Sequence, residues 1–287
     1  MDSARSSDSP TYSTVSLDPD MTIRPGSGDP SRISSSFTDF LRTERPELLP
    51  QPEAFHGALQ AVEATTIVAL RYQDGVVMAG DRRATEGFSI AHRAMEKVFP
   101  ADGYSAIGIA GAAGPAVEMV RLFQTELEYY EKVEGEALSL AGKANHLGRM
   151  IRANLPAAMQ GFVVLPLFGG FDPRTGDGRI YRYDVTGGLS EETDYHAVGS
   201  GGRDAKNSLK KLYVRADDID ATRSIQIVVE ALTDASEEDA GTAGPDPVHG
   251  IYPTVFLIDA SGVREIPQDE VEPVARGILE RRGAINR

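Results

Sequence analysis

The feature that most constrains this chain is a short apolar hairpin that is followed by charged residues. Its two Val/Ile/Ala-rich runs, Thr65–Arg71 and Gly75–Gly80, flank a Gln-Asp-Gly turn, a pattern typical of a β-hairpin. A hairpin returns the chain to its starting point, so Asp81, directly after the second strand, is expected beside the first residue of the hairpin. If a further strand runs back from about Ser89 along the same sheet, Lys97 reaches the same place.

This spacing predicts a hydroxyl, a carboxylate and an ammonium in mutual contact, which suits a nucleophile tuned by a charge pair. Thr65 is a weak nucleophile and needs a base, and no histidine lies at a helpful register nearby. If Thr65 were the first residue of a mature chain, its own α-amine, with an ordinary pKa of about 7.7 to 8, would serve as the base. Lys97 would then keep that amine neutral and Asp81 would orient Lys97. The alternative is an ordinary strand threonine beside a surface ion pair.

Further motifs lie in a fixed order along the chain. Together with the hairpin they resemble the proteasome β-type subunits, of the actinobacterial kind, and they cover the chain from Thr65 to roughly Arg282. The matching segments are TTIVAL at Thr65–Leu70, AGDRR at Ala79–Arg83, Lys97, GIAG at Gly108–Gly111, AMQG at Ala158–Gly161, VGSGG at Val198–Gly202 and DAGTAGPD at Asp239–Asp246.

The order of the expected elements favours an α+β fold. Strands come in blocks and helices in pairs, which argues against alternating βαβ units and for two antiparallel sheets between helix layers. This agrees with the four-layer αββα sandwich of N-terminal-nucleophile hydrolases that the resemblance implies. A turn is expected at 100–103 and a helix stop at Gly135. Further strands are expected at 104–110, 162–168, 179–184, 196–198, 254–258 and 263–266. One helix is expected to begin after Gly114-Pro115. Four more helices are expected at about 139–155, 203–213, 219–237 and 269–281.

The first 64 residues differ from the rest in composition. Residues 1–35 are rich in Ser with scattered Pro, Gly and Asp, so they are expected to be disordered. Residues 36–49 hold enough apolar side chains for a short helix that docks on another surface. The resemblance implies that residues 1–64 are a propeptide, cut off between Ala64 and Thr65, and that residues 65–287 form one catalytic domain. The family usually has Gly where this chain has Ala64.

The resemblance also implies roles for residues outside the hairpin. It assigns an oxyanion-stabilising N–H to Gly111 and places Ser200, Asp239 and Thr242 near the nucleophile, where the family most often has Ser at the position of Thr242. The alternatives are a helix-entry role for Gly111 and a helix N-cap for Ser200. Two other interpretations are weaker. The glycines at 108–114 follow GxxGxxG, not the dinucleotide-binding GxGxxG, and Ser200 lacks the GxSxG elbow of a Ser-His-Asp hydrolase.

The resemblance also implies an apolar pocket that receives the substrate side chain preceding the scissile bond. An apolar pocket gains free energy from burying apolar surface, so chymotrypsin-like cleavage after Leu, Tyr or Phe is expected. The residues assigned to this pocket are Ala84, Met95, Ile109 and Ala113, with Thr85, Ala91 and Phe99 in the same neighbourhood. The five histidines show no metal-binding spacing, so neither a metal nor another cofactor is expected.

Composition narrows the class of partners. The formal net charge of −14 argues against nucleic acid and anionic membranes. The absence of cysteine excludes a thiol nucleophile and suits a reducing cytoplasm, and the N-terminus lacks the apolar segment of a secretory signal. The resemblance implies seven-membered rings of this chain, α-subunit rings, a gating ATPase and unfolded polypeptide substrates. Two alternatives remain: an N-terminal-nucleophile amidohydrolase for a small amide, and a catalytically silent ring subunit.

Overall fold

The computed structural model describes residues 65–86 and 89–285. The chain divides into two units, Met1–Glu53 and Ala54–Arg287, and every described residue belongs to the second. The predicted propeptide, with Ala64 and the expected helix at residues 36–49, therefore lies outside the described residues.

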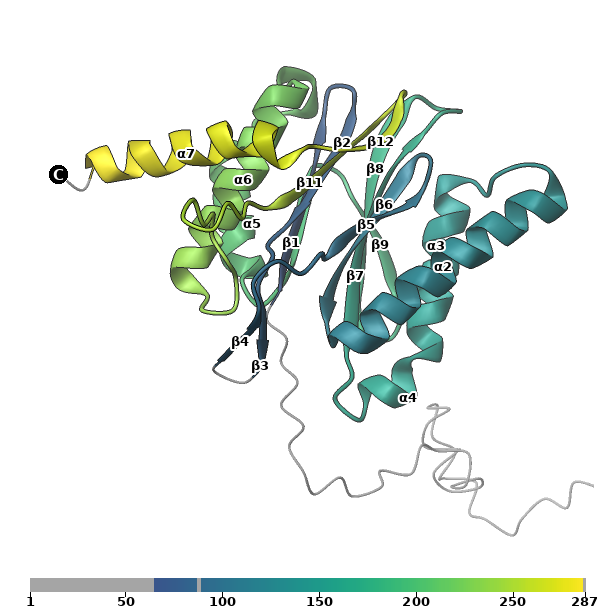
Figure 1. The fold of residues 1–287 in the computed structure, drawn as a ribbon. Helices are drawn as coiled ribbons and strands as arrows, with labels where there is room; N and C mark the ends of the chain where they lie inside the picture. Colours follow the sequence, from purple (N-terminus) through teal and green to yellow (C-terminus); the bar gives the residue numbers. More distant parts are fainter. Residues whose placement is uncertain (1–64, 87–88, 286–287) are drawn as a thin grey trace, which may run out of the picture. The chain divides into compact units, whose positions relative to one another are not determined.

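Two five-stranded sheets form the centre of the described domain, and every strand pair in them is antiparallel (Figure 1). The first has the order β10-β1-β2-β11-β12, with bounds Tyr195–Gly199, Thr66–Tyr72, Gly75–Gly80, Thr254–Asp259 and Gly262–Glu265. The second has the order β5-β6-β7-β8-β9, with bounds Val98–Asp102, Ser105–Gly111, Val164–Asp172, Asp177–Tyr183 and Leu189–Glu192.

Helices cover the outer face of each sheet. In Figure 1, α2 and α3 lie beside the second sheet, whereas α5, α6 and α7 lie beside the first. The helices are α2 (Ala113–Glu134), α3 (Leu140–Ala153), the short α4 (Leu155–Ala158), α5 (Gly202–Leu212), α6 (Ala221–Glu238) and α7 (Gln268–Ile285), with a 3₁₀ turn at Ala216–Asp218. The result is the predicted four-layer αββα sandwich, which confirms the fold class.

Side-chain alternation in β1 shows how the layers are held together. Ile67 and Ala69 belong to the apolar cluster between the two sheets, and Val68 and Leu70 belong to the cluster under α5, α6 and α7. Successive side chains of a strand point to opposite faces, so a central strand between two packed layers must be apolar at every position. The uninterrupted apolar run in the sequence follows from this position.

Local signals account for several element ends. Helix α2 ends at Gly135, which has φ +75° in the left-handed region and confirms the predicted stop. Its first residue is Ala113, so Gly114 and Pro115 lie inside the first turn and not ahead of it. Ser139 caps α3 by accepting a hydrogen bond from the Gly142 N–H at 3.1 Å.

Two expectations for the segment before α2 are wrong. The strand from Ser89, β4 (Ser89–His92), does not join the main sheet; it pairs with β3 (Ala84–Glu86) in a separate two-stranded hairpin. The expected turn at residues 100–103 is largely strand β5, which contains Pro100. This strand is an edge of the second sheet, where a proline costs no ladder hydrogen bond if its nitrogen faces outward.

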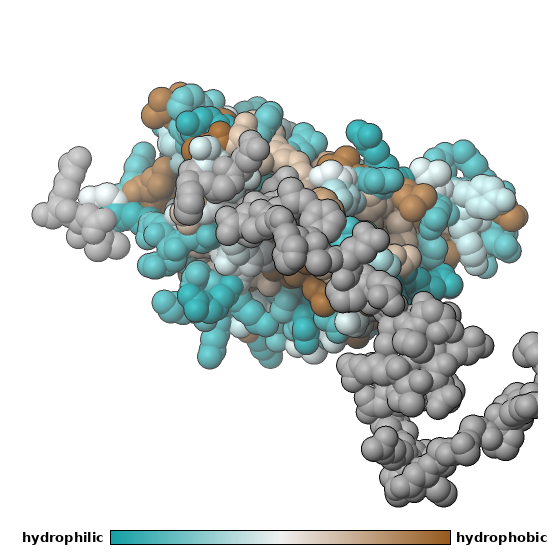
Figure 2. All heavy atoms as spheres, turned by 90° about the horizontal axis from the view of Figure 1, so that it is seen from below, coloured by the Kyte–Doolittle hydropathy of each residue, from teal (hydrophilic) through white to brown (hydrophobic). Residues whose placement is uncertain are grey.

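On the face shown in Figure 2, hydrophobic residues are scattered among hydrophilic ones, as on most water-exposed protein surfaces. Among the described helices, none combines the length and the apolar character that crossing a membrane requires.

Candidate active site

The β1–β2 hairpin places Asp81 across from the start of β1, as predicted. Ile67 pairs with Gly80 at the open end of the hairpin, and the Asp81 N–H donates to the Thr66 carbonyl oxygen at 3.1 Å. Lys97 arrives by another route than expected, because it lies one residue ahead of β5 in the second sheet. Its carbonyl oxygen accepts from the Ile109 N–H at 2.9 Å, which fixes this backbone against β6. The site therefore lies where the two sheets meet.

The Asp81 carboxylate is buried and is surrounded by donors. Its Oδ1 accepts from the Thr66 N–H and from Lys97 Nζ, both at 2.8 Å. Its Oδ2 accepts from the Arg83 N–H at 2.9 Å and the Ala243 N–H at 3.0 Å. An ionised carboxylate only accepts hydrogen bonds, so it satisfies all four donors, whereas an amide would place its NH₂ against two donors in either orientation.

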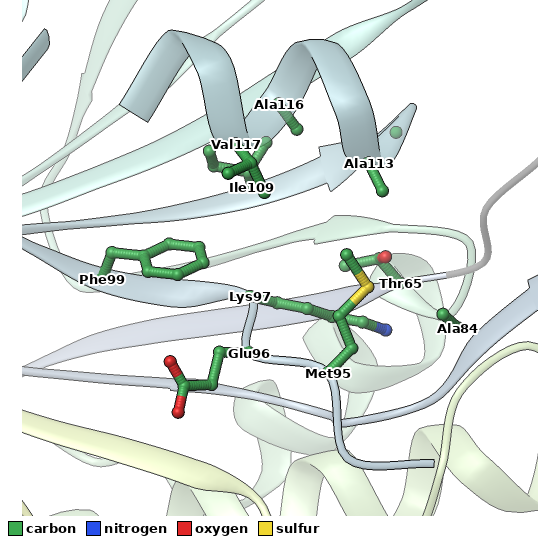
Figure 3. Close-up of a pocket in the computed structure, with 11 residues that line it drawn as sticks. Thr65, Ala84, Met95, Glu96, Lys97, Phe99, Ile109, Ala113, Ala116 and Val117 are labelled. Carbon is green, nitrogen blue, oxygen red and sulfur yellow. The ribbon is translucent and has the colours of Figure 1, made fainter. Parts of the chain in front are cut away.

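The Lys97 side chain is 4% exposed, so its ammonium is held away from bulk water. It forms an ion pair with Asp81 at 2.8 Å and donates to the Arg83 carbonyl oxygen. A buried charge is tolerated only when it is paired and hydrogen-bonded. In Figure 3 the side chain extends past Met95, with its nitrogen on the side of Thr65 and Ala84. Thr65 is itself 4% exposed, and it lines the same hollow as Lys97 (Figure 3).

Strand β10 fixes the backbone of Thr65. The Ser200 N–H donates to the Thr65 carbonyl oxygen at 2.9 Å, and Thr66 pairs with Gly199. Gly199 has φ +107°, and a Cβ there would lie 1.7 Å from the Thr65 carbonyl oxygen. Only glycine permits this approach, so Gly199 is required for the backbone of the candidate nucleophile to lie here.

Ser200, Asp239 and Thr242 form one hydrogen-bonded cluster behind Thr65. Asp239 Oδ2 accepts from Ser200 Oγ at 2.5 Å and from Thr242 Oγ1 at 2.6 Å, and Oδ1 accepts from the Gly241 N–H at 3.2 Å. Partial burial alone would raise the pKa of the Asp239 carboxyl, but these hydrogen bonds, led by that from Ser200, outweigh it and lower the pKa below its usual value. The cluster therefore presents an ionised carboxylate near neutral pH.

Sequence reasoning assigned no role to Thr66 or Arg83, and the structure connects both to this group. The Thr66 hydroxyl lies 2.6 Å from Thr242 Oγ1 and accepts from the Gly201 N–H at 3.0 Å. Arg83 donates through Nη1 to the Ala240 carbonyl oxygen at 3.0 Å, which ties the segment after Asp81 to the loop of Asp239. The repeated threonine of TTIVAL was the only signal available for Thr66.

Gly111 lies at the end of β6, beside the start of α2. It has φ +116°, and a Cβ there would lie 2.0 Å from the Val163 carbonyl oxygen. The next residue, Ala112, donates its N–H to that same oxygen at 2.9 Å. The close approach to Val163 is a packing reason for this glycine that exists independently of any catalytic one.

A hollow opens between α2 and the segment around Lys97, with Thr65 on its wall (Figure 3). About 330 Å³ within it is free of protein atoms, part of this space being open to solvent. Five of the seven predicted pocket residues line it, whereas Thr85 and Ala91 do not. The full lining is Thr65, Ala84, Met95, Glu96, Lys97, Phe99, Ile109, Gly111, Ala113, Ala116 and Val117.

Glu96 is an acidic lining residue that sequence reasoning missed. Its carboxylate points away from the Lys97 nitrogen in Figure 3, and the residue is exposed. The wall around Phe99, Ile109 and Val117 is apolar. Among the described residues, no group of three or more His, Cys, Asp or Glu side chains is arranged to hold a metal ion.

Comparison with known proteins agrees with this geometry. A family model described as "Proteasome subunit" matches residues 61–247. A "Proteasome subunit beta" of Streptomyces griseus is 54% identical over 252 residues, which cover 87% of this chain and 89% of the relative. Proteins with the same description from Stackebrandtia nassauensis and Acidimicrobium ferrooxidans are 52% and 56% identical, and cover 87% and 78% of this chain and 91% and 82% of the relatives. The chain therefore belongs to the proteasome subunit family, as a bacterial β-type subunit.

Proposed function

We propose that this chain is a threonine endopeptidase, with Thr65 as an N-terminal nucleophile. The observation that carries the proposal is the position of Thr65, which is buried and lines the same hollow as Lys97, the partner of Asp81 in a buried ion pair. A threonine hydroxyl is a weak nucleophile and needs a base. A free α-amine on the same residue supplies that base without a histidine.

In this mechanism Thr65 Oγ1 attacks the scissile carbonyl carbon, and its proton passes to the α-amine, directly or through a water. The positive charge of Lys97 disfavours protonation of the amine, which keeps it available as a base. The Gly111 N–H stabilises the negative charge that develops on the carbonyl oxygen. The amine returns the proton to the leaving nitrogen, and a water then hydrolyses the ester between Thr65 and the substrate. Asp81 keeps Lys97 in place, and the cluster of Ser200, Asp239 and Thr242 orients the amine and the water.

The α-amine exists only after the bond between Ala64 and Thr65 is broken, so the chain is made as an inactive precursor and cleaves itself there. The test is the intact mass of the purified protein together with its N-terminal sequence. Loss of residues 1–64 and a start at Thr-Thr-Ile-Val are expected. A protein that cleaves peptides while retaining Ala64, or that starts at another residue, contradicts the mechanism.

The family membership supports a matching assembly. The chain forms seven-membered rings with its own copies, stacks against rings of proteasome α-type subunits, and receives unfolded polypeptides through a gating ATPase in the cytoplasm. The alternatives have less support. A silent ring subunit would not require the buried Lys97–Asp81 pair beside Thr65, and no specific contact favours a small amide substrate.

The hollow predicts the side chain preferred before the scissile bond. Its apolar wall gains about 25 cal/mol for each Å² of apolar surface buried, and a charged side chain would lose hydration there without a partner. Fluorogenic peptides that differ only at this residue should be cleaved faster after Leu, Tyr or Phe than after Arg or Glu. Faster cleavage after Arg that disappears in Glu96→Gln would contradict this prediction and would show that the Glu96 carboxylate turns into the hollow.

A further inference from the structure

Thr66 joins the two halves of the candidate active site. It is completely buried, and its N–H donates at 2.8 Å to the Asp81 oxygen that also accepts from Lys97. Its hydroxyl faces the other half, where it lies 2.6 Å from Thr242 Oγ1 and accepts from the Gly201 N–H at 3.0 Å. One residue therefore contacts both the ion pair and the cluster behind Thr65.

The direction of the hydrogen bonds follows from counting protons. A threonine hydroxyl has one proton to donate, and Thr242 directs its proton to the Asp239 carboxylate at 2.6 Å. In the contact between Thr66 and Thr242, the donor must therefore be Thr66. The hydrogen bonds therefore run in series: the Gly201 N–H donates to Thr66, Thr66 donates to Thr242, and Thr242 donates to Asp239. The Thr66 hydroxyl is needed both as acceptor and as donor.

The space around these hydrogen bonds is closely filled. A Cβ on Gly201 would lie 2.6 Å from Thr242 Oγ1, 2.7 Å from Thr66 Oγ1 and 3.2 Å from Asp239 Oδ2. Three side-chain oxygens thus converge on the backbone next to Ser200, whose N–H holds the Thr65 carbonyl oxygen. A small displacement of Thr66 would be passed to Ser200 and to the backbone of the nucleophile, because nothing compressible separates them.

We infer that Thr66 is a positioning residue for the proposed threonine peptidase, and that its hydroxyl sets where Ser200, Asp239 and Thr242 lie relative to Thr65. The inference rests on the proposed function. Thr66 touches no reacting atom in that mechanism; it acts through the two groups that it joins.

Thr66→Val tests the hydroxyl, because valine keeps nearly the same shape and removes both hydrogen bonds. The buried Gly201 N–H then lacks its acceptor and Thr242 lacks its donor. A misplaced catalytic group lowers the rate more than it weakens substrate binding, so kcat is expected to fall about tenfold or more, with KM within about twofold of the unmodified protein. Thr66→Ser keeps the hydroxyl and should restore kcat to within about threefold.

Thr254→Val is the matched control. Thr254 is another buried threonine, on β11 opposite Gly80, and its Oγ1 has no hydrogen-bond partner among the described residues. Replacing it with valine removes a buried hydroxyl close to the site but leaves the hydrogen bonds of Thr66 intact, so kcat should stay within about twofold.

The measurement uses particles assembled from the full-length chain, with rates expressed per active site. A fluorescent peptide epoxyketone offers electrophilic carbons to both the hydroxyl and the amine of an N-terminal threonine, so its bound amount counts the competent sites. A purely structural role would reduce the number of sites and leave the rate per site unchanged. The expected result is a lower rate per site in Thr66→Val, normal rates in Thr254→Val and recovery in Thr66→Ser.

Three outcomes overturn the inference: an unchanged rate per site in Thr66→Val, a Thr66→Ser rate as low as that of Thr66→Val, or a Thr66→Val chain that does not fold while Thr254→Val does. An unmodified protein that neither binds the epoxyketone nor cleaves peptides would instead overturn the proposed function. The two failures are therefore distinguishable.

Discussion

Replacing Thr65 with Ala is expected to abolish peptide cleavage and to leave residues 1–64 attached, while the protein still folds and assembles. The substitution removes the only hydroxyl that the mechanism uses as a nucleophile, so kcat should fall by at least about 10³-fold. Folding should persist because the structure holds Thr65 mainly through its backbone, by the hydrogen bond from Ser200 to its carbonyl oxygen. Peptide hydrolysis and intact mass measure the two effects separately.

Two further variants make this result specific. Thr65→Ser keeps a hydroxyl on the same backbone and should retain processing and measurable cleavage. Thr175→Ala removes an exposed threonine from the turn between β7 and β8 and should behave as the unmodified protein. A Thr65→Ala chain that still loses residues 1–64 would show that another nucleophile, or another protease, makes the cut.

Much of the fold was predictable because its signals are local. The hairpin of β1 and β2 forms where the sequence predicts it, and Tyr72 pairs with Gly75, so the loop is only Gln73 and Asp74. The reason for Gly75 differs from expectation. It is the first residue of β2, and a Cβ there would lie 2.1 Å from the Ile258 carbonyl oxygen of β11. The glycine marks a close approach between neighbouring strands, which no local pattern distinguishes from a turn.

The failures share a cause, since each depends on residues far apart in the chain. Whether residues 89–92 pair with the main sheet or with residues 84–86 is decided by which partner is free, and periodicity does not encode this. Pro100 resembles a turn residue until its strand is known to be an edge. The Thr66 contact with Thr242 spans 176 positions, and the hollow that Glu96 lines is completed by residues of β6 and α2.

The ion pair of Lys97 and Asp81 gives the second large effect. Lys97→Ala removes a buried positive charge that lies 2.8 Å from a carboxylate. Breaking a buried pair by removing one partner typically costs about 3–5 kcal/mol, because the other charge is left uncompensated. Here the cost to the free energy of unfolding should be smaller, since three backbone N–H groups, those of Thr66, Arg83 and Ala243, still donate to Asp81. The chain is therefore expected to fold.

Catalysis should not survive the same change. Without the ammonium nothing disfavours protonation of the Thr65 amine, so the base is lost, and kcat should fall by at least about 10³-fold with processing also blocked. Lys97→Arg should recover little, because the planar guanidinium cannot occupy the place of a compact ammonium between Asp81 and the Arg83 carbonyl oxygen. Thermal unfolding, intact mass and cleavage rate distinguish loss of folding from loss of chemistry. A folded Lys97→Ala protein that processes itself and cleaves peptides at the normal rate would show that the ion pair only stabilises the fold.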